Sequence, residues 1–60
     1  MNEIEERILG LIERFPGIRT AEIRHLLDTR PGVASLICTH LRRRGAITLT
    51  RKGGWTLVED

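Results

Sequence analysis

Residues 41–57 read LRRRGAITLTRKGGWTL and contain the end of one predicted helix followed by a predicted β-hairpin. Apolar side chains occupy every second position of two short runs, first Ile47 and Leu49 and then Trp55 and Leu57. Such alternation is typical of strands that bury one face. The polar, glycine-containing residues between the runs predict a turn. This stretch therefore predicts an antiparallel hairpin over about residues 46–58.

The register of this hairpin follows if all four apolar side chains share one face. Ile47 must then lie opposite Leu57, and Leu49 opposite Trp55. The pairing of Thr50 with Gly54 would leave a three-residue loop of Arg51, Lys52 and Gly53. We expect Gly53 to have the left-handed conformation. A hairpin this small is not stable alone, so we expect its apolar face, including Trp55, to pack against helices.

A first helix is predicted over about residues 3–14. Apolar side chains recur there at helical spacing: Ile4, Ile8, Leu11, Ile12 and Phe15. Asn2 and Glu5 have nearly the spacing of a capping box, and Pro16-Gly17 ends the helix. Gly10 costs about 1 kcal/mol relative to alanine in a helix interior, which we attribute to the close approach of another helix.

A second helix is predicted over about residues 20–27, with Thr20 as its cap. Its expected apolar face consists of Ala21, Ile23, Leu26 and Leu27. Ile18-Arg19, just before it, is long enough only for a bridge-like strand.

A third helix is predicted over about residues 31–44, after the polar break Asp28-Thr29-Arg30. Thr29 is a candidate cap, and Pro31 is acceptable in the first turn of a helix. Gly45 should end this helix, and three arginines precede it where cations complement the helix dipole. The second and third helices would form a helix-turn-helix unit.

Charge is unevenly distributed along the 60 residues, although the net charge is only +2. Residues 1–29 carry a balance of −2, whereas residues 30–60 carry +4, and 30–52 contain six basic residues and no acidic one. Nine of the ten basic residues are arginine, the side chain best suited to bidentate contacts with phosphate and guanine. This pattern indicates a polyanionic partner, and a solvated basic face without a partner is the alternative.

Several classes of protein fit the sequence poorly. Sixty residues suffice for one small domain without a substrate pocket, so we expect neither an enzyme nor a small-molecule substrate. No apolar run approaches the roughly 20 residues that span a membrane, and Met1-Asn2-Glu3 resembles no signal peptide. The single cysteine, Cys38, cannot form an internal disulfide, which favours the cytoplasm. A metal site from Cys38, His40 and His25 is disfavoured because Cys38 and His40 point away from each other on a helix, so we expect no metal and no cofactor.

The chain resembles the winged helix-turn-helix family over nearly its whole length. The resemblance rests on Thr20-Ala21-Glu22-Ile23, on Leu41–Ile47 (LRRRGAI) and on Gly54-Trp55-Thr56-Leu57. Its size and the Thr-Ala-Glu-Ile stretch are most similar to small bacterial transcription regulators of the PapI and FaeA type. The resemblance implies a mainly α fold with a small antiparallel β wing, in the order helix, short strand, helix, helix, strand, strand. It also implies binding to double-stranded DNA at the nucleoid, with the third helix in the major groove.

Helical phase divides the third helix into two faces. At about 100° per residue, one face is core: Ala34, Ile37, Cys38 and Leu41. The opposite face offers hydroxyls, an arginine and the apolar Leu36, which suit major-groove readout. Combined with the resemblance, this phase predicts base contacts from Ser35, Leu36, Thr39, His40 and Arg43. It predicts contacts to the backbone or minor groove from Thr29, Arg30, Arg42, Arg51 and Lys52.

Other interpretations stay open. Leu36 could be an ordinary surface residue or part of a protein interface, and Arg44 is expected to be structural. RNA binding is compatible with the sequence. A different class is a protein-interaction module, in which the acidic first two helices contact a basic patch of a larger regulator. One copy of so small a domain contacts few base pairs, so we expect weak DNA binding by the monomer, and specificity from a second copy or a larger partner.

Overall fold

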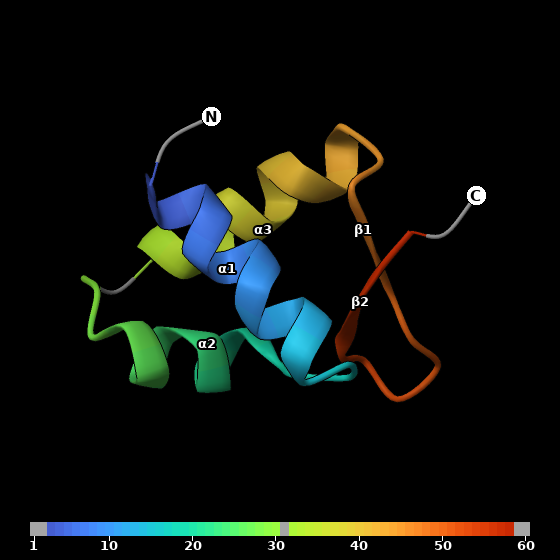
Figure 1. Cartoon of the computed structure of the whole chain (residues 1–60), viewed down its shortest axis with the longest axis horizontal. Helices are drawn as coiled ribbons and strands as arrows, with labels where there is room; N and C mark the ends of the chain where they lie inside the picture. The colour runs from blue at the N-terminus through green and yellow to red at the C-terminus, as the bar shows by residue number, and fades with distance from the viewer. Residues whose placement is uncertain (1–2, 31, 59–60) are drawn as a thin grey trace.

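The computed structural model describes residues 3–30 and 32–58. Three helices are followed by a two-stranded antiparallel sheet (Figure 1). The elements are α1 (Glu3–Arg14), α2 (Thr20–Leu27), α3 (Val33–Arg43), β1 (Ile47–Leu49) and β2 (Trp55–Leu57). The fold is therefore mainly helical with a small hairpin, in the predicted order. None of the helices in the described ranges has the length and apolar character required to cross a membrane.

The hairpin has the register that the alternating apolar residues predicted. Ile47 pairs with Leu57, Thr48 with Thr56 and Leu49 with Trp55. The Thr50 amide donates to the Gly54 carbonyl at 2.7 Å and closes the three-residue loop. A single bridge between Ile18 and Trp55 joins the connection after α1 to the outer side of β2, which confirms the bridge-like strand.

The core lies between the three helices and one face of the hairpin. Its buried side chains are Ile8, Ile12, Ile18, Ile23, Ala34, Cys38, Leu41, Ile47 and Trp55. Trp55 is only 7 % exposed, and its indole Nε1–H donates to the Thr20 hydroxyl at 2.8 Å. The prediction that Trp55 packs in the core is confirmed.

The third helix is shorter than the predicted span of 31–44. Gly32, with φ of 90°, has a left-handed conformation that no helical residue adopts, so α3 begins at Val33. The Gly32 carbonyl accepts the first helical bond, from Leu36 N at 2.9 Å, and Thr29 therefore does not cap this helix. At the other end the amides of Gly45 and Ala46 donate to the carbonyls of Arg42 and Leu41, a Schellman motif that ends α3 as expected.

The predicted cap of α2 was also wrong. Thr20 is the first residue of the helix and its hydroxyl is engaged by Trp55, whereas Arg19 is the N-cap. The Glu22 carboxylate accepts from the Arg19 amide at 3.1 Å. The proposed capping by Asn2 and the place of Pro31 lie outside the described residues.

Some predicted core residues lie at the surface. Phe15 is 48 % exposed and Leu26 57 % exposed, because α1 ends before Phe15 and α2 faces the core through Ile23. Ala21 is also exposed. Leu49 is 39 % exposed, although it pairs with the buried Trp55 and shares β1 with the buried Ile47.

Gly10→Ala is expected to raise the free energy of unfolding by about 0.5–1 kcal/mol. The predicted close approach of another helix is wrong, since a Cβ at Gly10 would meet no atom within 4 Å. Alanine restricts the unfolded chain and favours the helix without a steric cost. Urea titration followed by circular dichroism measures the change, and a loss of stability would contradict the open surroundings of Gly10.

Candidate nucleic-acid interface

The outer face of α3 is exposed where helical phase predicted it. Ala34, Cys38 and Leu41 are buried on the inner face, and Leu36 on the outer face is 71 % exposed. The other residues of the outer face are exposed too: Ser35, Thr39, Arg42 and Arg43. These positions make base contact sterically possible, and their predicted roles stay predictions.

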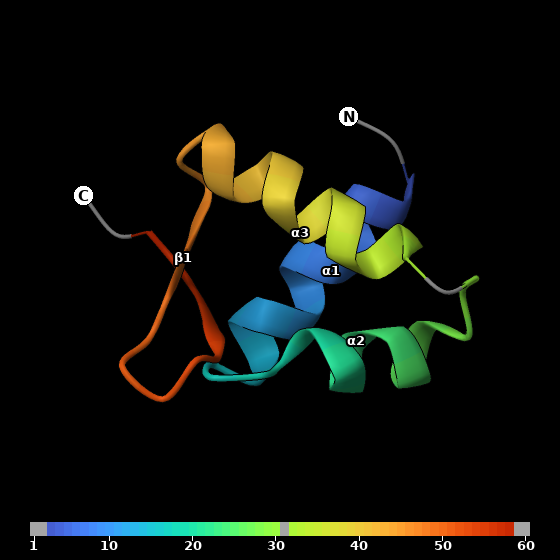
Figure 2. The same cartoon turned by 180° about the vertical axis from the view of Figure 1, so that it is seen from behind.

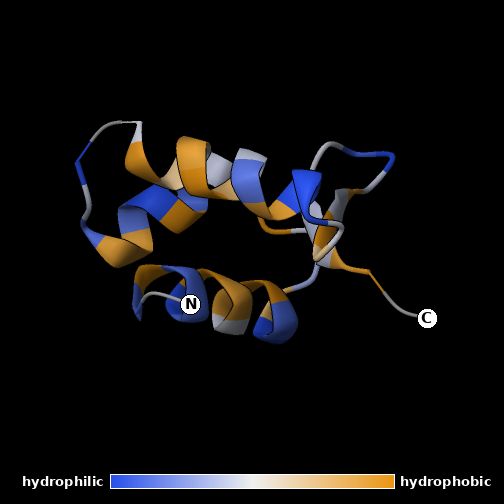
Figure 3. Cartoon of the chain, turned by 90° about the horizontal axis from the view of Figure 1, so that it is seen from above, coloured by the Kyte–Doolittle hydropathy of each residue, from blue (hydrophilic) through white to orange (hydrophobic). Residues whose placement is uncertain are grey.

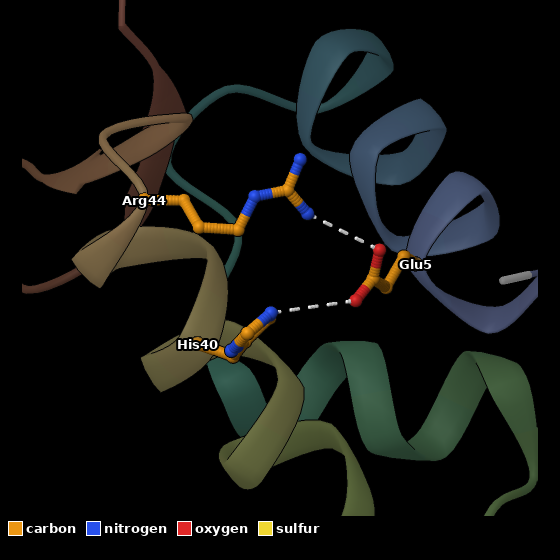
Figure 4. A network of polar contacts seen from close by, with 3 residues as sticks. All are labelled: Glu5, His40 and Arg44. Carbon is orange, nitrogen blue, oxygen red and sulfur yellow. Dashed lines mark hydrogen bonds and ion pairs between the residues drawn. The ribbon is translucent and has the colours of Figure 1, made fainter. Parts of the chain in front are cut away.

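His40 and Arg44 lie on the flank of α3 that faces α1, where both contact Glu5 (Figure 4). Arg44 Nη1 is 3.4 Å from Glu5 Oε2, and His40 Nε2 is 3.8 Å from Glu5 Oε1. The Glu5 side chain is only 11 % exposed, against 58 % for His40 and 45 % for Arg44. Arg44 thus has the structural contact that was expected. The His40 side chain points toward the Glu5 carboxylate and so lies at the edge of the outer face of α3.

The hairpin loop presents two exposed cations, Arg51 and Lys52. The loop backbone is held by Gly53 N donating to Thr50 O at 3.0 Å and by Gly54 N donating to Thr50 Oγ1 at 3.1 Å. Arg19 Nη2 donates to the Lys52 carbonyl at 2.8 Å, so a third cation reaches the loop from the connection between α1 and α2.

Arg19 was not among the candidate residues from the sequence. The available signal was the short strand Ile18-Arg19, whose pairing with Trp55 carries Arg19 to the hairpin. Glu5 was likewise assigned only to helix capping and to the acidic surface of the first two helices, although it connects α1 to α3 through Arg44.

Thr29 and Arg30, before α3, are placed differently from each other. Arg30 is exposed. The Thr29 hydroxyl is covered from solvent and has no hydrogen-bond partner among the described residues. The structure therefore presents Arg30, but not the Thr29 hydroxyl, to an external phosphate.

The interface is electrostatically one-sided. Seen from above, α3 and the hairpin loop lie on the side of the molecule away from α1 (Figure 3). Viewed from behind, α3 stands in front of α1 and leads directly into β1 (Figure 2). The segment 29–58 contains no aspartate or glutamate, whereas α1 carries Glu3, Glu5, Glu6 and Glu13. A polyanion approaching α3 and the loop thus meets arginine and lysine, with α1 and its four glutamates on the other side of the molecule.

Cys38 lies in the core next to this surface. Burial raises the pKa of its thiol, and a hydrogen bond with Thr20 partly offsets that effect. The thiol is therefore neutral at pH 7 and packs as a small apolar group. Within 3–30 and 32–58, no three His, Cys, Asp or Glu side chains gather in a way that could hold a metal ion.

Comparison with known proteins gives no match: no family model, no curated protein and no solved structure is significantly similar to this chain.

Proposed function

We propose that the protein is a winged-helix module that binds double-stranded DNA and acts as a small transcriptional regulator. The observation that carries this proposal is the shared orientation of two basic elements. The helix α3 and the hairpin loop lie on the side away from α1 (Figure 3), and each carries two exposed basic residues, Arg42 and Arg43 on α3 and Arg51 and Lys52 in the loop. The hairpin is then the wing.

In this proposal α3 enters the major groove. Ser35, Leu36, Thr39 and Arg43 lie nearest the base edges: Arg43 donates to guanine, the hydroxyls to either kind of pair, and Leu36 contacts a thymine methyl. Arg42, Arg51, Lys52 and Arg30 contact phosphates or the minor groove, which positions the helix without reading sequence. His40 reaches DNA only from the flank, because it also faces Glu5 at 3.8 Å. Such a protein would work at the nucleoid, and binding by one copy would be weak.

An amide-shift titration with a generic duplex tests this proposal without knowledge of the operator. We expect shifts on the outer face of α3 and at residues 50–54, and none along the exposed face of α1. Single-stranded RNA and an RNA duplex serve as parallel arms. Shifts confined to α1 and α2, or stronger binding of either RNA, would contradict it.

Arg43→Ala is expected to relax base preference as well as affinity. A bidentate arginine contact to guanine discriminates by about 1–3 kcal/mol, so selection from a random duplex library should lose enrichment at one base pair. Arg7→Ala, on α1, removes an equal charge from a side chain paired with Glu3 at 3.0 Å and is the matched control. Unchanged enrichment in Arg43→Ala would remove Arg43 from the reading residues.

We propose a protein-interaction module as the second candidate, favoured by two exposed apolar side chains. Phe15 and Leu26 line an open hollow together with Pro16, Gly17, Ile18 and Glu22. Exposed aromatic and leucine side chains gathered in one place are typical of protein-contact surfaces. In this function a larger regulator binds α1 and α2 and supplies the DNA affinity, so the isolated chain would show no salt-dependent binding of DNA.

A further inference from the structure

The connection between α1 and α2 is fixed against the hairpin by two backbone hydrogen bonds. Gly17 N donates to the Trp55 carbonyl at 2.7 Å, and Trp55 N donates to the Ile18 carbonyl at 2.8 Å. Arg19 follows this bridge directly and is the N-cap of α2. Its backbone is therefore anchored at the foot of the hairpin loop, although Arg19 and Lys52 are 33 positions apart in the sequence.

The Arg19 guanidinium completes a basic hollow beside the loop. Its Nη2 donates to the Lys52 carbonyl at 2.8 Å, which restricts an otherwise flexible side chain. The hollow is lined by Pro16, Gly17, Arg19, Thr50, Arg51 and Lys52. Three of these residues are cations and none is a carboxylate. One guanidinium N–H is used internally, so the remaining donors of Arg19 are available to an external acceptor.

We propose that this hollow binds a phosphate group of the nucleic-acid backbone, with Arg19 as a direct ligand together with Arg51 and Lys52. A guanidinium held at a fixed position matches the paired oxygens of a phosphate, and less side-chain entropy is lost on binding. This inference rests on the proposed DNA-binding function. It extends the interface from α3 and the loop to the segment before α2.

Arg19→Ala and Arg19→Lys, compared with Arg7→Ala, test the role of Arg19 in duplex binding. Arg19→Ala is expected to lower affinity about tenfold at 0.1 M salt, and to make the slope of log affinity against log salt shallower by about 0.9. Arg19→Lys keeps the charge, so its slope should match that of the unsubstituted protein. Amide shifts that change only beside the lost contact, at Lys52 and Gly53, in free Arg19→Ala would show that the loop keeps its conformation.

The outcomes separate this inference from the proposed function. If Arg43→Ala weakens binding and Arg19→Ala does not, the hollow is not a phosphate site and the DNA-binding proposal stands. If neither substitution changes affinity or slope, the DNA-binding proposal itself fails. A change of slope in Arg19→Ala that Arg19→Lys does not restore, or a loss of affinity that accompanies a rearranged loop, would make Arg19 a structural support and overturn the inference.

Titration with inorganic phosphate, against chloride at equal ionic strength, distinguishes the source of the phosphate group. We expect millimolar phosphate to shift the amides of residues 51–54 weakly, and duplex DNA to shift the same amides at far lower concentration. Phosphate-dependent shifts that the duplex neither reproduces nor suppresses would assign the hollow to a free anion and overturn the assignment to the nucleic-acid backbone.

Discussion

Gly54→Ala is expected to lower the free energy of unfolding by about 3 kcal/mol or more, because the added methyl group has no space. A Cβ at Gly54 would overlap the carbonyl carbon and oxygen of Gly17, which are backbone atoms and cannot rotate away. Relief requires the connection after α1 to move off the hairpin. This would break the bonds of Gly17 N to Trp55 O (2.7 Å) and of Trp55 N to Ile18 O (2.8 Å).

This loss is large for so small a protein. A domain of 60 residues has a total stability of about 3–9 kcal/mol, so Gly54→Ala should lose a third or more of it and unfold at a much lower urea concentration. Gly53→Ala is the matched control. Its φ of 87° disfavours alanine by about 1–2 kcal/mol, but a Cβ there meets no atom within 4 Å. Urea titrations of both variants give the comparison, and a Gly54→Ala protein as stable as Gly53→Ala would contradict the close contact between Gly17 and Gly54.

The double substitution Arg51→Ala and Lys52→Ala is expected to reduce duplex affinity by on the order of 50-fold at 0.1 M salt. Each lost phosphate contact makes the slope of log affinity against log salt shallower by about 0.9, so the pair should change it by about 2. Both side chains are exposed, and the loop is closed by backbone bonds and Thr50 Oγ1, so the fold should persist. Because phosphate contacts carry no sequence information, all duplexes should be weakened alike.

A charge-matched control separates local contact from net charge. Arg7→Ala with Arg14→Ala removes two positive charges from α1, on the side away from α3 and the loop (Figure 3). Fluorescence anisotropy with a labelled duplex measures both doubles. Equal losses in the two would show that the hairpin loop makes no specific phosphate contact.

The local pattern of the sequence was sufficient to predict most of the fold. Alternation over Ile47–Leu49 and Trp55–Leu57 can be satisfied by only one register with a common apolar face, and this register is present. The starts and ends of α1 and α2 also match the predicted ranges. The errors arose where two segments compete for one group. Arg19, and not Thr20, is the N-cap of α2, and the Thr20 hydroxyl accepts a hydrogen bond from the buried indole of Trp55. Trp55 is 35 positions away in the sequence, so no local pattern predicts this contact.

The candidate site was predictable only in part, for the same reason. Phase along α3 identified an outer face that is exposed, from Ser35 to Arg43. The positions of Arg19 and Glu5 depend on contacts between segments more than 30 residues apart, to Lys52 and Arg44 respectively. Helical spacing also predicted that Leu26 shares the buried face of α2 with Ile23, whereas Leu26 is exposed. A helix of eight residues has too few turns for the sequence pattern to show how wide its buried face is.

The salt dependence of duplex-DNA affinity for the unsubstituted chain decides between DNA binding and protein interaction. Four phosphate contacts, from Arg30, Arg42, Arg51 and Lys52, predict a slope of log affinity against log salt of about −3.6, and a contact from Arg19 would steepen it by about 0.9. Affinity should therefore fall on the order of 100-fold between 50 and 200 mM salt. A slope near zero, or no binding at 50 mM, would contradict the proposal that α3 and the hairpin loop form a DNA interface.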